Sequence, residues 1–312
     1  MTRVAAIDCG TNSIRLLVSD VDTGSGAARD VTRQMRIVRL GEGVDASGEF
    51  SGAALERTFG ACREYAEQLR ALGSPPLRFV ATSASRDVTN RAQFVAGVRD
   101  ILGVQPEVIS GAEEGELSFD GATRGLPADA PAPYLVVDIG GGSTEFVLGS
   151  THPEHRISVD VGCVRMTERH LHDDPPGADA IAATIADIDA AIARAGQVVP
   201  LGQVATLVGL AGSVTTVSAL ALGLRDYDPR VIHHSRVSAA DVRRVSDELL
   251  AMPRAQRAAL PVMHPGRVDV IGAGALVLRR IMDATGAPEV LVSEHDILDG
   301  IAYGVAQRID PR

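Results

Sequence analysis

Two segments of the sequence each end a strand-like apolar run with an aspartate and continue with glycine and hydroxyl residues. They are Asp8-Cys-Gly-Thr-Asn-Ser13 and Asp138-Ile-Gly-Gly-Gly-Ser143. In such a loop the glycines let backbone N–H groups approach an anion, and the hydroxyls add further donors. An aspartate can serve a phosphate only through a bridging cation such as Mg²⁺, or by orienting a water. The two loops therefore predict phosphate chemistry.

A single loop of this kind is equally typical of an ordinary turn, because Asp, Asn, Gly and Ser dominate turns for conformational reasons. Two copies that share Asp-x-Gly and a serine five residues after the aspartate, in a chain of 312 residues, are harder to explain that way. The repeat indicates two similar domains that face one site. A chain of this length also suits two domains of ordinary size.

An arginine and two carboxylates follow other predicted strands. Arg86 comes after the hydroxyls of Thr82 and Ser83 and can pair with a phosphate, although a capped helix with a surface ion pair explains the same residues. Glu113 and Glu114 follow a strand and a glycine. One of them can take a proton from an attacking water, whereas the alternative is a helix whose first turn is acidic because of the helix dipole.

A third glycine and hydroxyl turn, Gly209-Leu-Ala-Gly-Ser213, connects a predicted strand to a predicted helix. Taken alone, this pattern is weak evidence for an anion site.

The composition argues against nucleic acid as the partner. The net charge is −10, aromatic residues make up 3% of the chain, and Trp is absent. A nucleic-acid-binding protein normally carries positive charge and aromatic stacking surfaces. The sequence contains no Lys and no GxxxxGK[ST] motif, which excludes a P-loop. An anion site must then rely on cations, backbone amides and arginines.

Cellular location follows from the cysteines and the N-terminus. Cys9, Cys62 and Cys163 are far apart and odd in number, so they predict neither a disulfide framework nor a zinc site. A strand-like sequence begins within four residues of the start, which leaves no room for a signal peptide. Residues 204–224 are uncharged and long enough to cross a bilayer, but their glycines favour a strand, a turn and a buried helix. We expect a cytoplasmic protein without a membrane partner.

Strands and helices alternate along the chain, which predicts an α/β protein with mixed sheets. The segment 125–133 carries three prolines and predicts a linker. The predicted strands are 4–7, 15–20, 36–40, 77–81, 108–111, two within 134–148, and 202–210. The predicted helices are 53–72, 90–102, 181–192 and 297–309.

The order of these motifs along the whole chain resembles the Ppx/GppA family, which comprises exopolyphosphatases and guanosine pentaphosphate phosphohydrolases of the actin-like ATPase superfamily. The similarity is greatest to the short actinobacterial exopolyphosphatases, which lack the helical C-terminal domains of longer members. The segments that carry the resemblance are Asp8-Cys-Gly-Thr-Asn-Ser-Ile-Arg15, Ala81-Thr-Ser-Ala-Ser-Arg-Asp87, Ile109-Ser-Gly-Ala-Glu-Glu114, Val137-Asp-Ile-Gly-Gly-Gly-Ser-Thr-Glu145, Val161-Gly-Cys163, Gly209-Leu-Ala-Gly-Ser213 and Gly266-Arg267.

The resemblance implies two actin-like, ribonuclease H-like domains, each with a mixed five-stranded sheet flanked by helices, and an active site in the cleft between them. The first domain would span 1–130 and be completed by a C-terminal helix over 298–312, and the second would span 131–297. It also implies a homodimer.

The resemblance further assigns roles to individual residues. Glu114 would be the base that activates water. Asp8, Asp138 and Glu145 would hold Mg²⁺ or Mn²⁺ or order the water, with Asp8 facing the others from the other domain. Arg267 would meet either substrate or a second subunit, and Cys163 is better explained as a small buried residue. The substrate-binding residues would be Gly10, Thr11, Asn12, Ser13, Arg15, Thr82, Ser83, Arg86, Gly140, Gly141, Gly142, Ser143, Thr144, Gly212, Ser213 and Arg267.

Three functions remain open from the sequence. The first is an exopolyphosphatase that hydrolyses the terminal phosphate of inorganic polyphosphate. The second is a phosphohydrolase that removes the 5′ phosphate of guanosine pentaphosphate (pppGpp), although no aromatic residue in the motifs is placed to stack a base. The third is a sensor that binds an alarmone such as ppGpp, or another nucleotide, with little turnover; the intact loops and Glu114 argue against it.

Two features depart from the family pattern or carry no assigned role. Leu298 and Asp299 stand where the family usually has Arg and Glu, which could alter domain packing, activity or chain-length preference. The eight histidines, including His233 and His234, show no metal-ligand spacing, and we expect them in solvated loops.

Overall fold

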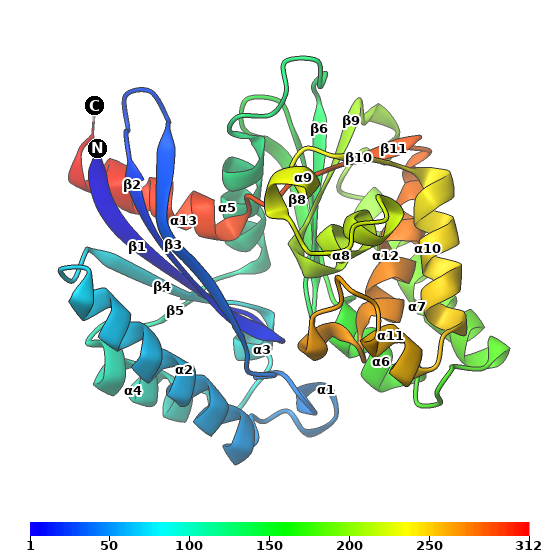
Figure 1. Ribbon diagram of the computed structural model, residues 1–312, viewed down its shortest axis with the longest axis horizontal. Coiled ribbons are helices and arrows are strands. Elements are labelled where there is room, and N and C mark those ends of the chain that lie inside the picture. Colours follow the sequence, from blue (N-terminus) through cyan, green and yellow to red (C-terminus); the bar gives the residue numbers. More distant parts are fainter. Residues whose placement is uncertain (312) are drawn as a thin grey trace. The chain divides into compact units, whose positions relative to one another are not determined.

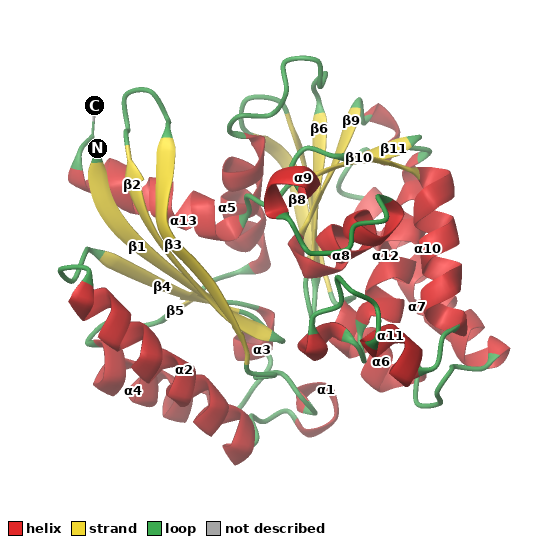
Figure 2. Cartoon of the chain, viewed as in Figure 1, coloured by secondary structure: helices red, strands yellow, loops and turns green. Residues whose placement is uncertain are grey.

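The protein is described by a computed structural model that covers residues 1–311. The chain divides into two compact units. Met1–Arg124 and the segment from Ile297 onward form the first, and Gly125–Asp296 form the second. Each unit contains one β-sheet with helices against it (Figures 1 and 2).

The sheet of the first unit has five strands in the order β3-β2-β1-β4-β5. The strands β1, β2 and β3 form an antiparallel meander, and β4 and β5 continue the sheet parallel to β1. The bounds of these strands are β1 Thr2–Cys9, β2 Ser13–Val21, β3 Ala28–Ile37, β4 Leu77–Ala81 and β5 Glu107–Val108.

Helices cover both faces of this sheet, as Figure 1 shows for α2 and α4 on one face and α13 on the other. Side chains alternate along β1 accordingly: Ile7 packs in a cluster with Tyr65 of α2, whereas Ala6 packs in another cluster with Ile301 of α13. The helices of this unit are α1 Val44–Ser47, α2 Gly52–Ala71, α3 Ser83–Arg86, α4 Arg91–Leu102, α5 Gly111–Thr123 and α13 Ile297–Ile309.

The sheet of the second unit has six strands in the order β10-β11-β9-β6-β7-β8. The prediction of five strands was wrong for this sheet, because the three-residue strand β10 adds an antiparallel edge beside β11. Its segment, Arg236–Ser238, is too short to have a recognisable period. The strand bounds are β6 Tyr134–Ile139, β7 Thr144–Gly149, β8 Pro153–Val159, β9 Thr206–Leu210, β10 Arg236–Ser238 and β11 Glu289–Val292.

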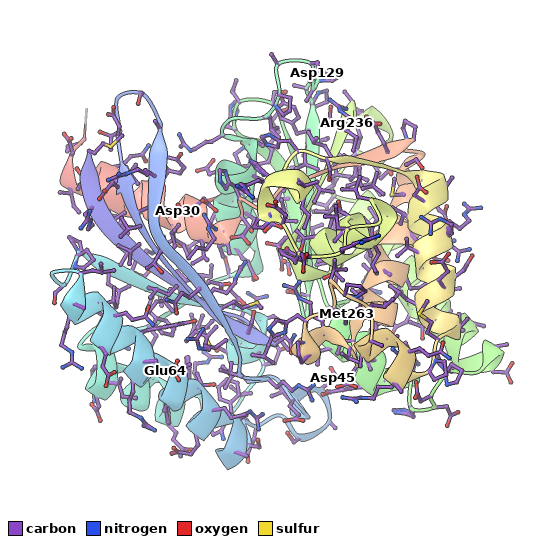
Figure 3. The ribbon with its side chains drawn as sticks, viewed as in Figure 1. Asp30, Asp45, Glu64, Asp129, Arg236 and Met263 are labelled. Atoms are coloured by element: carbon purple, nitrogen blue, oxygen red, sulfur yellow. The ribbon has the colours of Figure 1, made fainter. Side chains whose placement is uncertain are left out.

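One continuous core joins this sheet to the long helices of the second unit. Ion pairs support its periphery. Arg236 of β10 lies 3.3 Å from Asp129 and 2.6 Å from Glu289, and Figure 3 labels Arg236 and Asp129. The helices are α6 Cys163–His170, α7 Ala178–Gly196, α8 Ala211–Ala221, α9 Pro229–Ile232, α10 Ala239–Ala251, α11 Arg254–Ala258 and α12 Ile271–Thr285, with short 3₁₀ turns at Leu201–Gln203 and Pro265–Arg267.

The two sheets share one topology. The order β8-β7-β6-β9-β11 repeats β3-β2-β1-β4-β5, with the same antiparallel meander followed by two parallel strands. The two aspartate-glycine loops occupy equivalent places in it, since one joins β1 to β2 and the other joins β6 to β7. The repeat found in the sequence is therefore a repeat of architecture.

Most predicted elements are present, and three of them differ. The third strand spans Ala28–Ile37 rather than 36–40, because the chain turns at Arg39, which has a φ of 49°. The strand predicted at 108–111 is reduced to Glu107–Val108, and 202–210 contains a 3₁₀ turn before β9. The uncharged stretch 204–224 forms β9 and α8, and within residues 1–311 no helix is long and apolar enough to cross a membrane.

Candidate functional site

The first loop follows the buried Asp8 at the end of β1. Asp8 and Arg15 are partners across β1 and β2, and Arg15 Nη2 donates to Asp8 Oδ2 over 2.6 Å. The loop closes with a 3.0 Å bond from Gly10 N to Ser13 O. It is held from outside by residues 38–41, whose backbone N–H groups donate to the Asn12 and Thr11 carbonyls. The fold thus fixes the loop and neutralises its aspartate.

The catalytic candidate Glu114 lies in the first turn of α5 and is 8% exposed. Arg86 of α3 donates from Nη1 to Glu114 Oε2 over 2.7 Å and to the carbonyl of Ile109 over 3.2 Å. Thr82 and Ser83 are buried beside the end of β1, where Thr82 N donates to Cys9 O. The first unit therefore brings the loop 10–13, the hydroxyls and the Arg86–Glu114 pair together where strands β1, β4 and β5 end.

Glu113 points to a different partner, although it is the neighbour of Glu114. Its Oε1 accepts from Arg78 Nη2 over 2.7 Å, and its side chain is 43% exposed. Ser110 caps this helix by accepting from Glu113 N. The two adjacent carboxylates are thus separated: Glu113 is partly exposed and pairs with the buried Arg78, whereas Glu114 is buried and pairs with Arg86.

The second loop repeats the geometry of the first with one change of charge. Gly140 N donates to Ser143 O over 3.0 Å, as Gly10 does to Ser13. Asp138 of β6 and Glu145 of β7 are direct register partners, at the positions that Asp8 and Arg15 hold in the first unit. Side chains of directly opposed residues in antiparallel strands lie on the same face. Two carboxylates therefore share one face here, where the first unit has an ion pair.

Hydroxyl groups orient the buried carboxylate of Glu145, which is 1% exposed. Its Oε1 accepts from Ser143 Oγ over 2.8 Å and from Ser158 Oγ of β8 over 2.7 Å. Sequence reasoning missed Ser158, because only the β7–β8 register, in which it faces Glu145, reveals it.

The three glycines of this loop lie against the start of α6. Backbone N–H groups of Cys163 and Val164 donate to the carbonyls of Gly140 and Gly141, and Arg165 Nε donates to Gly142 O over 2.7 Å. A Cβ on Gly162 would overlap the backbone of Gly141, so this close approach requires glycine. Arg165 is a second residue that the motifs did not indicate. Cys163 is buried, as expected.

The third loop lies beside the second, because Leu210 at the end of β9 is the parallel partner of Asp138. At its turn Ala211 has a φ of 66°, a strained value for a residue with a side chain. A Cβ on Gly212 would overlap the guanidinium of Arg267, which donates from Nη1 to Thr216 Oγ1 over 3.0 Å. Arg267 is thereby placed over Gly212, next to Ser213 at the start of α8.

Asp138 and Glu145 suit Mg²⁺ in their donor chemistry, since this ion prefers hard oxygen ligands and usually takes one or two carboxylates together with waters and substrate phosphates. Within residues 1–311, no group of three or more Asp, Glu, His or Cys side chains is arranged to hold a metal by itself. Asp8, the other predicted ligand, accepts from Arg15. The carboxylate pair of the second unit is therefore the better candidate for a cation.

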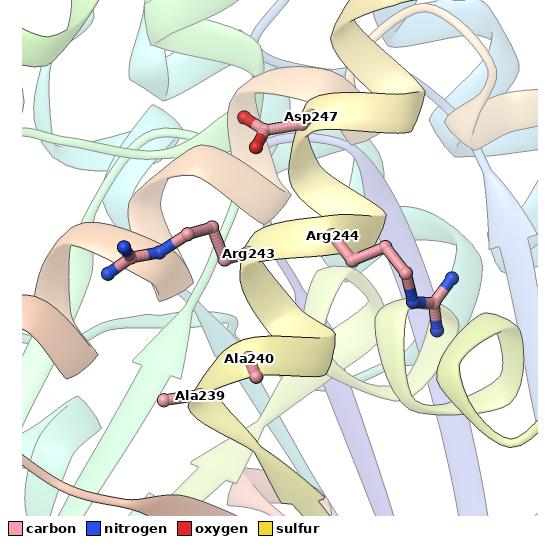
Figure 4. Close-up of a pocket in the computed structure, with 5 residues that line it drawn as sticks. All are labelled: Ala239, Ala240, Arg243, Arg244 and Asp247. Carbon is pink, nitrogen blue, oxygen red and sulfur yellow. The ribbon is translucent and has the colours of Figure 1, made fainter.

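A surface cavity of about 470 Å³ lies along α10 and includes none of the predicted site residues (Figure 4). Ala239, Ala240, Arg243, Arg244 and Asp247 line it. Its charged side chains are engaged in ion pairs, with Arg243 on Asp283, Arg244 on Glu248 and Asp247 on Arg279. It offers no unpaired charge for a ligand.

Comparisons with known proteins agree with these motifs. Residues 17–309 match the model of the Ppx/GppA phosphatase family. The chain is 51% identical to exopolyphosphatase 2 of Mycobacterium tuberculosis, over 98% of this chain and 99% of that protein. It is 29% identical to a guanosine-5′-triphosphate,3′-diphosphate pyrophosphatase of Aeromonas salmonicida, over 96% of this chain and 59% of that protein. A solved exopolyphosphatase-like protein superposes with a TM-score of 0.95 at 43% identity, over 99% of this chain and all of the other.

Proposed function

Because this chain belongs to the Ppx/GppA phosphatase family, we propose that it is an exopolyphosphatase, a hydrolase that cleaves the terminal phosphoanhydride bond of inorganic polyphosphate. The observation that carries the proposal is the set of two equivalent aspartate-glycine loops together with the buried Glu114. The exopolyphosphatase of M. tuberculosis, which matches the chain from end to end, supports the same substrate.

Glu114 is the proposed base. Water attacks the terminal phosphorus, a new P–O bond forms, the bridging P–O bond breaks, and the shortened polyphosphate departs as an anion. Glu114 accepts the proton that the water loses. Arg86, at 2.7 Å, orients the carboxylate. Such proton transfer is most effective when the accepting carboxylate is fixed within hydrogen-bond reach of the water.

The phosphate groups are proposed to bind at the loops 10–13, 140–144 and 212–213. Backbone N–H groups and hydroxyls stabilise the negative charge that spreads over the phosphoryl oxygens during transfer. Arg267, held over Gly212 and bonded to Thr216, adds a positive charge at the third loop.

Asp138 and Glu145 are proposed to hold Mg²⁺ or Mn²⁺, which would neutralise phosphate charge when bound. Ser143 and Ser158 fix the Glu145 carboxylate for this role. Asp8 is proposed to act indirectly, since its pair with Arg15 sets the position of the loop that follows. The proposal also includes a homodimer, as the family resemblance implies, which analytical ultracentrifugation would test. A cytoplasmic location is proposed from the three separate cysteines.

Phosphate release tests the proposal directly. Purified protein with Mg²⁺ is offered short polyphosphate, long polyphosphate and pppGpp in parallel, with Glu114→Gln as the inactive comparison. We expect release from polyphosphate that is lost in the variant. Faster release from pppGpp than from either polyphosphate would instead assign the activity of the A. salmonicida relative. Tight binding of a nucleotide by folded protein without release from any substrate would favour a sensor and overturn the proposal.

A further inference from the structure

Three histidines of the second unit stack on one another. The ring of His233 lies between those of His234 and His295, with centroid distances of 3.7 Å and 4.5 Å. His233 and His234 follow α9, whereas His295 follows β11. The prediction that the histidines occupy solvated loops was wrong for this cluster, because its members are only partly exposed and contact each other.

One hydrogen bond fixes the protonation state of the central ring. The backbone N–H of Glu294 donates to Nδ1 of His233 over 3.2 Å. A ring nitrogen that accepts a hydrogen bond carries no proton, so this bond requires the neutral ring of His233 with its proton on Nε2. Protonation of Nδ1 would abolish this bond and place a cation against two other imidazoles.

Residues 293–296 form the loop that His233 contacts. This loop follows the carboxyl end of β11, beside the end of β9 where the third glycine loop begins. Val292 is the parallel partner of Gly209, and Ser293 N donates to Gly209 O over 3.0 Å. In the topology that the two sheets share, β11 corresponds to β5. Residues 293–296 therefore correspond to the loop that follows β5, contains Ser110 and leads to Glu114. A shift of residues 293–296 would therefore displace Gly209, the first residue of the third loop.

The side chain of Glu294 connects this loop to Tyr227, which precedes α9. Glu294 Oε1 accepts from the Tyr227 hydroxyl over 2.6 Å. Burial, the negative charge of Glu294 and the hydrogen bond to it raise the pKa of Tyr227, while the positive charge of Arg267 opposes this rise.

We propose that His233 is a pH-sensitive latch on residues 293–296, which holds this loop and its Tyr227–Glu294 hydrogen bond in place when neutral and releases them when protonated. The strand side of the latch stays in place, because His234 N and Ser235 O bond to the backbone of Val292 whatever the charge of the rings. The loop after Val292 is the part that is freed. This inference rests on the proposed function for its effect on substrate, but the latch itself can be measured without turnover.

The charges around His233 determine the direction of the switch. Burial, and secondarily His295, lower the pKa of His234, so the cluster resists a positive charge. The carboxylate of Glu294 accepts from Tyr227, and the charges of Asp228 and Arg230, around α9, are paired with each other. Because the bond from Glu294 N exists only with the neutral ring, its stabilisation is lost as the pH falls and His233 gains a proton. The charged and titratable groups on the segments that carry or contact His233 are Tyr227, Asp228, Arg230 and His234 around α9, and Glu294, His295 and Asp296 after β11.

Hydrogen exchange at the backbone amide of Glu294 measures whether its bond to His233 is formed. This exchange, corrected for the intrinsic pH dependence, is measured at pH 8 and pH 5.5 in wild type, His233→Asn and His172→Asn. The Asn Oδ1 takes the place of Nδ1 and does not titrate. We expect about fivefold loss of protection at pH 5.5 in wild type and in the exposed-histidine control, corresponding to one neutral hydrogen bond, and no loss in His233→Asn.

The same variants link the latch to substrate binding. The KM for tripolyphosphate should rise up to about fivefold between pH 8 and pH 5.5 in wild type relative to His233→Asn, since any titration of the substrate affects both equally. Equal protection of Glu294 at both pH values in wild type, or equal loss in His233→Asn, would overturn the proposal. So would NMR detection of a proton on His233 Nδ1 at pH 8. Absence of phosphate release would reject the proposed function while leaving the exchange result valid.

Discussion

Asp138 and Glu145 are register partners on β6 and β7, so two buried carboxylates share one face of the second sheet. At the equivalent positions of the first sheet, Asp8 faces Arg15, which donates to it. The repeated hairpins thus differ by a reversal of charge at one position. In the first hairpin Arg15 neutralises Asp8, whereas the second hairpin places two acidic side chains on the same face.

We expect Glu145→Gln to abolish stabilisation by Mg²⁺. Wild type should melt at a higher temperature with Mg²⁺ than with EDTA, because a ligand that binds only the folded state stabilises it. The variant should show no such difference and should melt above wild type in EDTA, since a like-charge pair has been removed. Glu154→Gln, an exposed change on the neighbouring strand β8, is the control and should respond to Mg²⁺ as wild type does. An undiminished Mg²⁺ shift in Glu145→Gln would contradict this assignment.

Two adjacent glutamates should differ sharply in importance. Glu114→Gln keeps the shape of the side chain but removes its basicity, and we expect kcat for polyphosphate to fall about 10²- to 10⁴-fold, the usual contribution of a general base. Glu113→Gln should leave kcat within about twofold, because its carboxylate bonds to Arg78 and not to Arg86 or Glu114, and Arg78 keeps Glu107 as a second partner. Steady-state kinetics on the two proteins decides, and equal losses would show that the helix start, rather than the base, had been disturbed.

Gly212→Ala should weaken substrate binding by displacing Arg267. The added methyl group would overlap the guanidinium, which must move from its bond to Thr216. We expect KM to rise about tenfold, as the loss of one charge-assisted hydrogen bond would give, with a smaller effect on kcat. Gly202→Ala, whose methyl group meets open space, should behave as wild type. An unchanged KM in Gly212→Ala would remove Arg267 from the proposed binding residues.

The last helix offers a matched pair of glycines for a stability test. A Cβ on Gly300 would overlap the backbone of Leu117 in α5, so Gly300→Ala should destabilise the protein by about 1–3 kcal/mol through overpacking. Gly304→Ala on the same helix meets nothing and should stabilise by about 0.5–1 kcal/mol. Urea unfolding measures both. Similar effects of the two substitutions would mean that α13 does not approach α5 as closely as described.

The cysteines should be unreactive in the native protein. Burial raises the pKa of all three thiols, that of Cys62 to about 12, which keeps them protonated at pH 8, and the thiolate is the reactive form. We expect no rapid reaction with Ellman's reagent before denaturation and three equivalents after it. Rapid labelling of Cys163 in folded protein would place it at an open surface instead.

Local chemistry explains which parts of the site could be predicted. The loops after Asp8 and Asp138 consist of consecutive residues, so their glycines, their hydroxyls and the strands on either side could be identified from the sequence. Ser158 acquires its role only because β8 pairs with β7 in a register that places it opposite Glu145. His233 likewise meets His295 only after β11 has joined the sheet. Contacts of this kind depend on pairing between distant segments, which no local period reveals.

Asp299 illustrates the same limit in the first unit. Its departure from the family pattern was visible, but its partner was not: Arg33 Nη2 lies 2.5 Å from Asp299 Oδ1, across 266 positions of sequence. Leu298 is buried in the cluster of α13 and β1. In this chain the two substituted residues therefore attach α13 to its own unit.

The attachment of α13 has a consequence for biosynthesis. One face of the first sheet, with Val4, Ala6 and Leu17, is covered by Ile297, Ile301 and Val305 of α13. The three residues of α13 are translated only after the second unit, so the nascent first unit emerges with an uncovered apolar face and keeps it while the whole second unit is translated. A ribosome stalled before residue 297 would present that surface to chaperones and proteases.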